Sequence, residues 1–150
     1  MGALRAAETY RFGTIGVGEV FAMFRDGVLD GDDEVALVYD PETYRHFSEP
    51  LVNIRRALEM ALAGKAIDES EMNQLLLRMK SLYFPERSYE TLQYLCPAFG
   101  DFVRGSLMPD VKRDDARQLL FTIKEMQRCR SLIFNEHESS GVAHRPPTPL

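Results

Sequence analysis

The sequence has no tryptophan and little cysteine or histidine, two of the residue types from which metal sites and catalytic triads are built. Cys96 and Cys129 are the only cysteines, too few and too far apart for a zinc ribbon or a disulfide scaffold. The three histidines, His46, His137 and His144, show no ligand spacing and complete no Ser-His-Asp or Cys-His set. The sequence therefore predicts two reduced thiols, no metal site and no cofactor.

Long apolar runs and an excess of positive charge are also missing. No apolar stretch approaches the roughly 18 residues of a membrane span. Charges at Arg5 and Glu8 exclude a signal peptide at the start of the sequence. The formal net charge of −5 argues against non-specific nucleic-acid binding, which needs a basic face. We expect a cytoplasmic protein that binds neither membranes nor nucleic acids.

The composition is that of an ordinary globular chain, with 45% hydrophobic and 27% charged residues. A chain of this length can bury about 70% of the surface that it exposes when unfolded. From residue 135 onward Ser, Gly and Pro dominate, which is typical of disorder. We predict a folded helical domain over residues 1–134 and a disordered tail over residues 135–150.

Apolar residues recur at spacings of three and four along most of the chain, which predicts helices. Asp68 and Glu71 resemble a capping box that opens one helix, and Pro85 stops that helix. Further helices are predicted over residues 3–12, 19–26, 48–63, 89–95 and 111–134, with a short one near 99–107. The last helix is expected to bury a stripe made of Ala116, Leu119, Leu120, Ile123 and Met126.

One segment does not follow helical spacing. Residues 34–39 are almost continuously apolar, which predicts a strand covered on both faces. Residues 40–43 have turn chemistry, and residues 44–47 can return as a pairing strand. The predicted fold is therefore mainly α with one short β-hairpin at about 34–47. Because such a hairpin is marginal alone, we expect it to lie on the helices or to extend a sheet.

Residues 47–56 concentrate polar chemistry at a predicted helix start. Ser48 is a good N-cap, and Pro50 suits a first turn whose N–H groups have no helical partner. Glu49 and Asn53 lie one turn apart on one face, and Asn53 is a poor helix former in this position. A capped amphipathic helix with a solvated polar face is the alternative interpretation, which the spacing alone leaves open.

Arginines meet carboxylates or an amide in three places. These groups are Arg5 with Glu8, Arg55 with Glu49 and Asn53, and Arg87 with Glu86. Such groups suit the binding of an anion, with arginine stabilising a developing oxyanion and a carboxylate activating water. For Arg5 and Glu8 the spacing alone favours an exposed ion pair of little energetic weight.

Five segments, in order, resemble the TfuA-like protein family. The central one is Ser48-Glu49-Pro50-Leu51-Val52-Asn53-Ile54-Arg55, and the others span residues 1–8, 32–37, 84–89 and 112–116. Members of this family usually carry a strand-rich half before the first of these segments. The resemblance therefore implies that the chain corresponds to the C-terminal half of an α/β protein whose N-terminal half is absent.

The resemblance also implies a function. TfuA-like proteins accompany YcaO enzymes, which use ATP to activate a peptide-backbone amide so that sulfide replaces its oxygen. The TfuA-like partner is expected to hydrolyse the C-terminal thiocarboxylate of a ubiquitin-like sulfur carrier and so release sulfide. A non-catalytic accessory module that docks on the YcaO enzyme is the alternative, and the sequence leaves both open.

The residues of the site follow from the resemblance. Catalytic roles are predicted for Glu49, Asn53 and Arg55, anion binding for Arg5, Arg87 and Ser48, and supporting roles for Glu8 and Glu86. Glu49 would orient or deprotonate water, and Asn53 would hydrogen-bond the carbonyl. We expect the absent half to cover residues 34–39 and 3–12, so that this chain exposes apolar surface there and self-associates.

Overall fold

The structure, a computed structural model, describes residues 3–104 and 107–139, with side chains up to residue 130. The prediction of a mainly helical chain is confirmed, because seven α-helices and three short 3-10 helices make up the ordered elements of these residues. They are α1 (Ala3–Glu8), η1 (Thr9–Phe12), α2 (Glu19–Arg25), η2 (Asp32–Glu34), α3 (Leu51–Ala63), α4 (Glu69–Ser81), η3 (Phe84–Glu86), α5 (Tyr89–Leu95), α6 (Pro97–Val103) and α7 (Val111–Ser139). Within these ranges no helix has the length and apolar character needed to cross a membrane.

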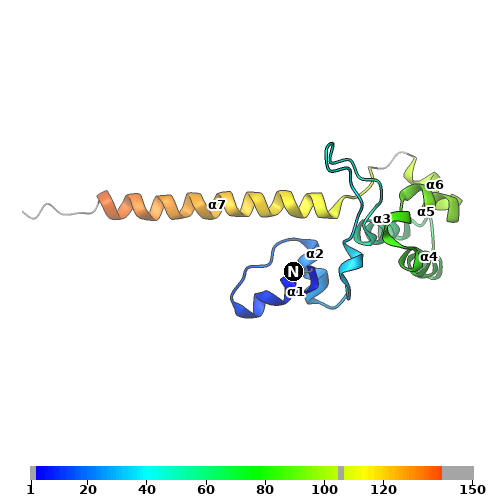
Figure 1. Cartoon of the computed structure of the whole chain (residues 1–150), viewed down its shortest axis with the longest axis horizontal. Coiled ribbons are helices and arrows are strands. Elements are labelled where there is room, and N and C mark those ends of the chain that lie inside the picture. Colours follow the sequence, from blue (N-terminus) through cyan, green and yellow to red (C-terminus); the bar gives the residue numbers. More distant parts are fainter. Residues whose placement is uncertain (1–2, 105–106, 140–150) are drawn as a thin grey trace, which may run out of the picture.

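Helix α3 is the centre of the main core. Its predicted apolar stripe is buried, with Leu51, Ile54 and Leu58 all fully inaccessible to solvent. Each such side chain stabilises the fold by about 1.5–3 kcal/mol through removal of apolar surface from water. The stripe packs with residues of α4, α5 and α6, and these helices gather at one end of the molecule (Figure 1). These partners include Leu75, Met79, Leu92 and Phe99.

A second, smaller core joins α1 and α2 to the start of α7. Its buried members are Phe24, Leu29, Val52 and Val111. The carboxylate of Asp115 in α7 accepts hydrogen bonds from the N–H groups of Glu19 (2.8 Å) and Val20 (2.7 Å), which start α2. Gly18 just before them has φ 98°, and a Cβ there would collide with this carboxylate. The first turns of α7 are therefore fixed to α2.

Beyond these first turns, α7 runs away from the body as a long rod (Figure 1). The predicted burial of its apolar stripe is wrong: Leu119, Leu120, Ile123 and Met126 are 45%, 68%, 43% and 54% exposed. The reason is that α1 and α2 reach only the start of the helix. Helix α7 also continues to Ser139, past its predicted end, and residues 140–150 of the predicted tail lie outside the described residues.

The predicted β-hairpin is not confirmed. In the part of the chain that the structure describes there is no sheet, and an isolated antiparallel bridge pairs Tyr39 with His46. Glu34, the first residue of the predicted strand, lies in η2 instead. Its side chain is buried in the core. The N–H of Val38 donates to the Ser48 hydroxyl (2.8 Å), so this N–H is not available for a hydrogen bond to a neighbouring strand. Without further strands beside it, a two-stranded hairpin is only marginally stable.

Helix α4 begins with the predicted capping box. The Asp68 carboxylate accepts from the N–H of Glu71 (2.8 Å), and the Glu71 carboxylate accepts from the N–H of Asp68 (3.2 Å). We expect Asp68→Ala to lower the free energy of unfolding by about 1 kcal/mol, because an N-cap acceptor is lost. Urea denaturation measures this change, and Asp68→Asn, which keeps an acceptor oxygen, serves as the control. An unchanged midpoint in Asp68→Ala would contradict the prediction.

Candidate functional site

The candidate site is built around Glu49 and Asn53 at the start of α3. Pro50 has extended backbone (ψ 144°), so the helix begins at Leu51 and Glu49 lies just before its first turn. The Asn53 amide nitrogen donates to the Glu49 carboxylate (3.1 Å) and makes a longer contact with Asp110 (3.5 Å). The Asn53 amide oxygen accepts from the N–H of Val111 (2.9 Å), where α7 begins.

These contacts explain why an asparagine occupies a helical position that it does not favour. Its side chain is 1% exposed, and both ends of its amide find partners on different elements. A buried amide without such partners would destabilise the fold. Asn53 therefore fixes the carboxylate of Glu49 relative to the first turn of α7.

Burial raises the pKa of the half-buried Glu49 carboxyl above its usual range, because it penalises the ionised form. The hydrogen bond from Asn53 and the nearby His46 oppose this shift, whereas the carboxylates of Asp110 and Glu90 add to it. A carboxyl whose pKa lies closer to neutrality exchanges protons more readily under working conditions. Glu49 is thus suited to act as a general base.

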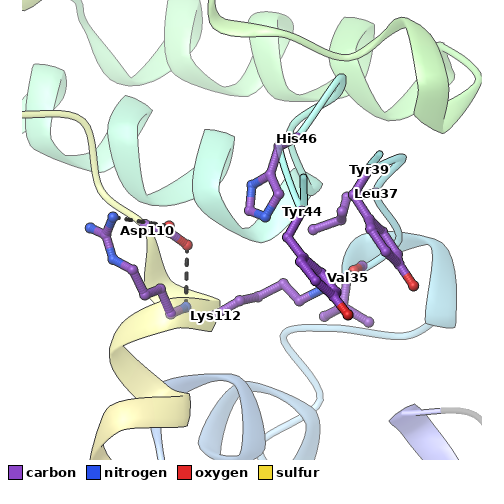
Figure 2. A pocket seen from close by; sticks show the side chains of 8 residues that line it. Val35, Leu37, Tyr39, Tyr44, His46, Asp110 and Lys112 are labelled. Carbon is purple, nitrogen blue, oxygen red and sulfur yellow. Dashed lines mark hydrogen bonds and ion pairs between the residues drawn. The ribbon is translucent and has the colours of Figure 1, made fainter. Parts of the chain in front are cut away.

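An open pocket with a volume of about 640 Å³ has Asp110, a contact of Asn53, in its wall (Figure 2). It is lined by Val35, Leu37, Tyr39, Tyr44, His46, Asp110, Lys112 and Arg113. Asp110 and His46, which line this pocket, both act electrostatically on the Glu49 carboxyl, and Asp110 also contacts Asn53.

One wall of the pocket is a pair of tyrosines. The rings of Tyr39 and Tyr44 stack with centroids 6.3 Å apart and an interplanar angle of 8°. Tyr44 has φ 56°, in the left-handed region that non-glycine residues rarely adopt, which costs free energy. Its N–H donates to the carbonyl of Asp40 (2.8 Å), and this tight turn sets the ring against Tyr39. The pocket rim is therefore a defined turn.

Basic side chains face the pocket from two sides (Figure 2). Lys112 donates to the carbonyl of Val35 (2.7 Å), and burial lowers the pKa of its ammonium while Asp110 opposes that shift. Arg113 pairs with Asp110 at 3.5 Å, and His46 lies on the opposite wall. Basic groups beside aromatic rings suit a ligand that combines a negative charge with an apolar or planar part.

Arg55 does not join Glu49 and Asn53. Its guanidinium pairs with the carboxylate of Glu34 at 3.2 Å. The Glu34 side chain is fully buried and also takes an ion pair from Lys80 at 3.0 Å. This arrangement gives Arg55 a partner of its own on a different face of α3, and the ion pairs bind η2 to α3 and α4.

Arg87 is buried, with 2% of its side chain exposed. All three guanidinium nitrogens donate to protein oxygens. The acceptors are the carbonyls of Met79, Lys80, Leu82 and Asp33 and the carboxylate of Asp33. The backbone carbonyl of Arg87 accepts from the N–H of Glu49 (2.8 Å). Arg87 thus positions Glu49 through its backbone, while its side chain binds the end of α4.

The remaining predicted residues lie apart from this pair. Ser48 does not cap α3, since its hydroxyl accepts from Val38 and the N-cap of the helix is Pro50. Arg5 pairs with Glu8 at 2.7 Å on the surface, where 75% of the Arg5 side chain is exposed. Glu86 is exposed in η3. Of the predicted set, the structure brings the side chains of Glu49 and Asn53 into contact and places the arginines elsewhere.

The pocket residues were missed by sequence reasoning. Lys112 gave one signal, because a cation in the first turn of a helix opposes the macrodipole and needs another partner. The tyrosines at 39 and 44 gave none, because their pairing depends on the turn between them. Among the described residues, no group of three or more His, Cys, Asp or Glu side chains is arranged to hold a metal ion.

The fold and the site define a class of protein: a helical protein whose carboxylate–amide pair contacts, through Asp110, the wall of a pocket lined by tyrosines and basic side chains. The sequence model of the TfuA-like protein family matches residues 1–88, more than half of the 150-residue chain. The chain therefore belongs to the TfuA-like family. No curated protein matches it significantly. The matched range contains Glu49 and Asn53 and ends before Asp110 and Lys112.

Proposed function

We propose that this TfuA-like protein supplies sulfide to a YcaO enzyme for peptide-backbone thioamidation in the cytoplasm. It would do so by hydrolysing the C-terminal thiocarboxylate of a ubiquitin-like sulfur carrier. One observation carries the proposal: the half-buried Glu49, with its raised pKa, is held by Asn53, which also contacts Asp110 in the wall of a pocket with basic side chains. Membership of the family supports the same class of function.

Substrate binding requires positive charge, because a thiocarboxylate and the Glu49 carboxylate repel each other. In this proposal Lys112, His46 and Arg113 bind the anion from the walls of the pocket. They take the anion-binding role predicted for Arg5, Arg87 and Ser48, which do not line this pocket. Arg55 acts indirectly, by fixing η2 through its ion pair.

In the hydrolysis, Glu49 accepts a proton from water as the oxygen of that water adds to the carbonyl-type carbon of the thiocarboxylate. The tetrahedral intermediate then collapses, the C–S bond breaks, and sulfur leaves as hydrosulfide. Thiocarboxylate and water thus give carboxylate, hydrosulfide and one proton, with no oxidant or reductant. Asn53 keeps the carboxylate oriented toward the water, which is the requirement for general-base catalysis.

The direct test is sulfide release from a thiocarboxylated carrier incubated with the protein, measured against the rate of spontaneous hydrolysis. We expect Lys112→Ala to raise KM about tenfold with a smaller change in kcat, because a charge that binds the anion is lost. Lys124→Ala, at an exposed position of the same helix, is the matched control and should leave both constants unchanged. Equal KM values for the two variants would remove Lys112 from the anion site.

The alternative is a non-catalytic module that docks on a YcaO enzyme. The observation that favours it is apolar surface in the segment from η1 to α2, where Phe12 is 88% and Ile15 is 66% exposed. Exposed apolar patches commonly mark protein–protein contacts. Absence of sulfide release from any carrier, together with faster thioamidation by the YcaO enzyme when this chain is added, would establish the docking module instead.

A further inference from the structure

Helix α7 carries an apolar seam whose spacing is that of a coiled coil. The seam consists of Ala116, Leu119, Ile123 and Met126, separated alternately by three and four residues, and Arg130 ends it at the next position of this spacing. Leu119, Ile123 and Met126, its three large apolar residues, are about half exposed. Ala116 and Leu119 line a groove together with residues of α1 and α2, and Ile123 and Met126 follow on the same face of α7.

We propose that the seam pairs with the seam of a second copy of this chain, the two α7 helices running antiparallel. This pairing goes beyond the proposed hydrolysis and does not depend on it. The seam continues an interface that the fold already uses: α1 and α2 pack on the first turns of α7, and the partner helix would be the next element along the same face.

The flanks of the seam favour a second copy over a charged partner. At 100° per residue, the positions beside it are occupied by Leu120, Thr122, Gln127 and Cys129, none of which is charged. Four of the five charged residues of this stretch lie on the outer face of the helix: Arg117, Lys124, Glu125 and Arg128. Between Ala116 and Cys129 the seam and its flanks are neutral, so two copies meet there without like-charge repulsion, whereas an acidic or basic partner would find no complementary charge in that stretch.

The position of α1 and α2 decides the orientation. They lie on the seam side of α7, where a groove of about 380 Å³ is lined by Ala3, Ala7, Phe21, Ala116 and Leu119, among others. In a parallel pair, both copies would place α1 and α2 at the same end, where the partner helix must pass. An antiparallel pair places them at opposite ends, so the two bodies do not compete for the seam.

The size of the contact sets the expected affinity. From Ala116 to Arg130 the seam is about 21 Å long at 1.5 Å per residue, less than most stable dimers bury. The backbone of α7 continues to Ser139, so each helix can also extend over the groove of the other copy. We expect a reversible dimer with a dissociation constant on the order of 10 µM.

Sedimentation equilibrium of the whole chain between about 1 and 200 µM tests the pairing. We expect the average mass to rise from the 17.1 kDa of one chain toward twice that value. Ile123→Glu combined with Met126→Glu should weaken the dimer at least about 100-fold, since two charges are buried without partners. The matched control is Phe121→Glu, which changes a 64% exposed side chain on the opposite face and should leave the dimer intact.

Because these side chains are exposed in the single chain, the variants should fold, and circular dichroism checks this. A monomeric mass at every concentration overturns the pairing, as does equal dissociation by Phe121→Glu. Orientation is tested by Thr122→Cys, which in an antiparallel pair should form a disulfide with Cys129 of the second copy. A crosslink that persists after Cys129→Ser would overturn the antiparallel arrangement.

Discussion

Replacing Glu49 by glutamine is expected to lower sulfide release from a thiocarboxylated carrier by about 100-fold or more, because the general base is lost. Glutamine keeps the shape of the side chain and an oxygen that can accept the hydrogen bond from Asn53. Carrier binding should therefore persist. The measurement is kcat for sulfide release together with the affinity for the carrier, each compared with the unaltered protein.

The pH dependence gives the same variant a second readout. Since burial raises the pKa of Glu49, the acid limb of the rate profile should lie above the usual range of a glutamate and should vanish in Glu49→Gln. A carboxyl whose pKa is raised by folding stabilises the fold fully only at low pH, and this contribution is lost as the pH rises through the raised value. At neutral pH, Glu49→Gln should therefore be at least as stable as the unaltered protein.

A matched control separates the base from a general charge effect. Glu90→Gln removes an exposed carboxylate close enough to act on the pKa of Glu49, and it should retain sulfide release. Undiminished release from Glu49→Gln would remove that residue as the base. Absence of release even from the unaltered protein would instead support the docking module.

The features that could be predicted from the sequence are the local ones. The capping box of Asp68 and Glu71 involves residues three apart, so the pattern contains the whole interaction. The buried stripe of Leu51, Ile54 and Leu58 follows from helical periodicity. The contact between Glu49 and Asn53 joins residues four apart at the start of α3, as their spacing predicted.

The features that could not be predicted depend on residues far apart in the chain. Ser48 is a good N-cap by type, but Val38, ten residues away, uses its hydroxyl. Glu34 was assigned to a strand, and it is buried because Arg55 and Lys80, 21 and 46 residues away, neutralise it. No local pattern shows that such partners will meet.

The same limit applies to the pocket and to α7. Asn53 and Asp110 are 57 residues apart, and the pocket wall that contains Asp110 and Lys112 exists only once the start of α7 has docked. The apolar spacing of α7 predicted a helix, which the structure confirms, but not that most of its apolar face would be left without a covering element. The structure leaves Leu119, Ile123 and Met126 partly exposed, which the pairing of two copies would explain.

Replacing Arg87 by alanine is expected to lower the free energy of unfolding by about 3–5 kcal/mol, the range typical of breaking a buried charged network. The guanidinium donates hydrogen bonds to the carbonyls of Met79 and Leu82 at the end of α4. It also donates to the carbonyl of Asp33 in η2. Without it, buried carbonyls at the end of a helix lose their partners. A loss of this size removes a large share of the stability of a typical domain.

Urea denaturation of Arg87→Ala measures this loss, and Arg104→Ala is the matched control. Arg104 pairs with Asp101 on the surface, with 81% of its side chain exposed, so its removal should cost less than about 1 kcal/mol. Arg87→Lys should recover only part of the stability, because one ammonium cannot reproduce the planar fork that reaches acceptors on both sides.

The structural role and the anion-binding role of Arg87 predict different outcomes for Arg87→Ala. An anion-binding arginine would lose activity at nearly unchanged stability, whereas a structural one loses stability first. Full stability in Arg87→Ala with a raised KM for the carrier would return Arg87 to the anion site and overturn the structural role.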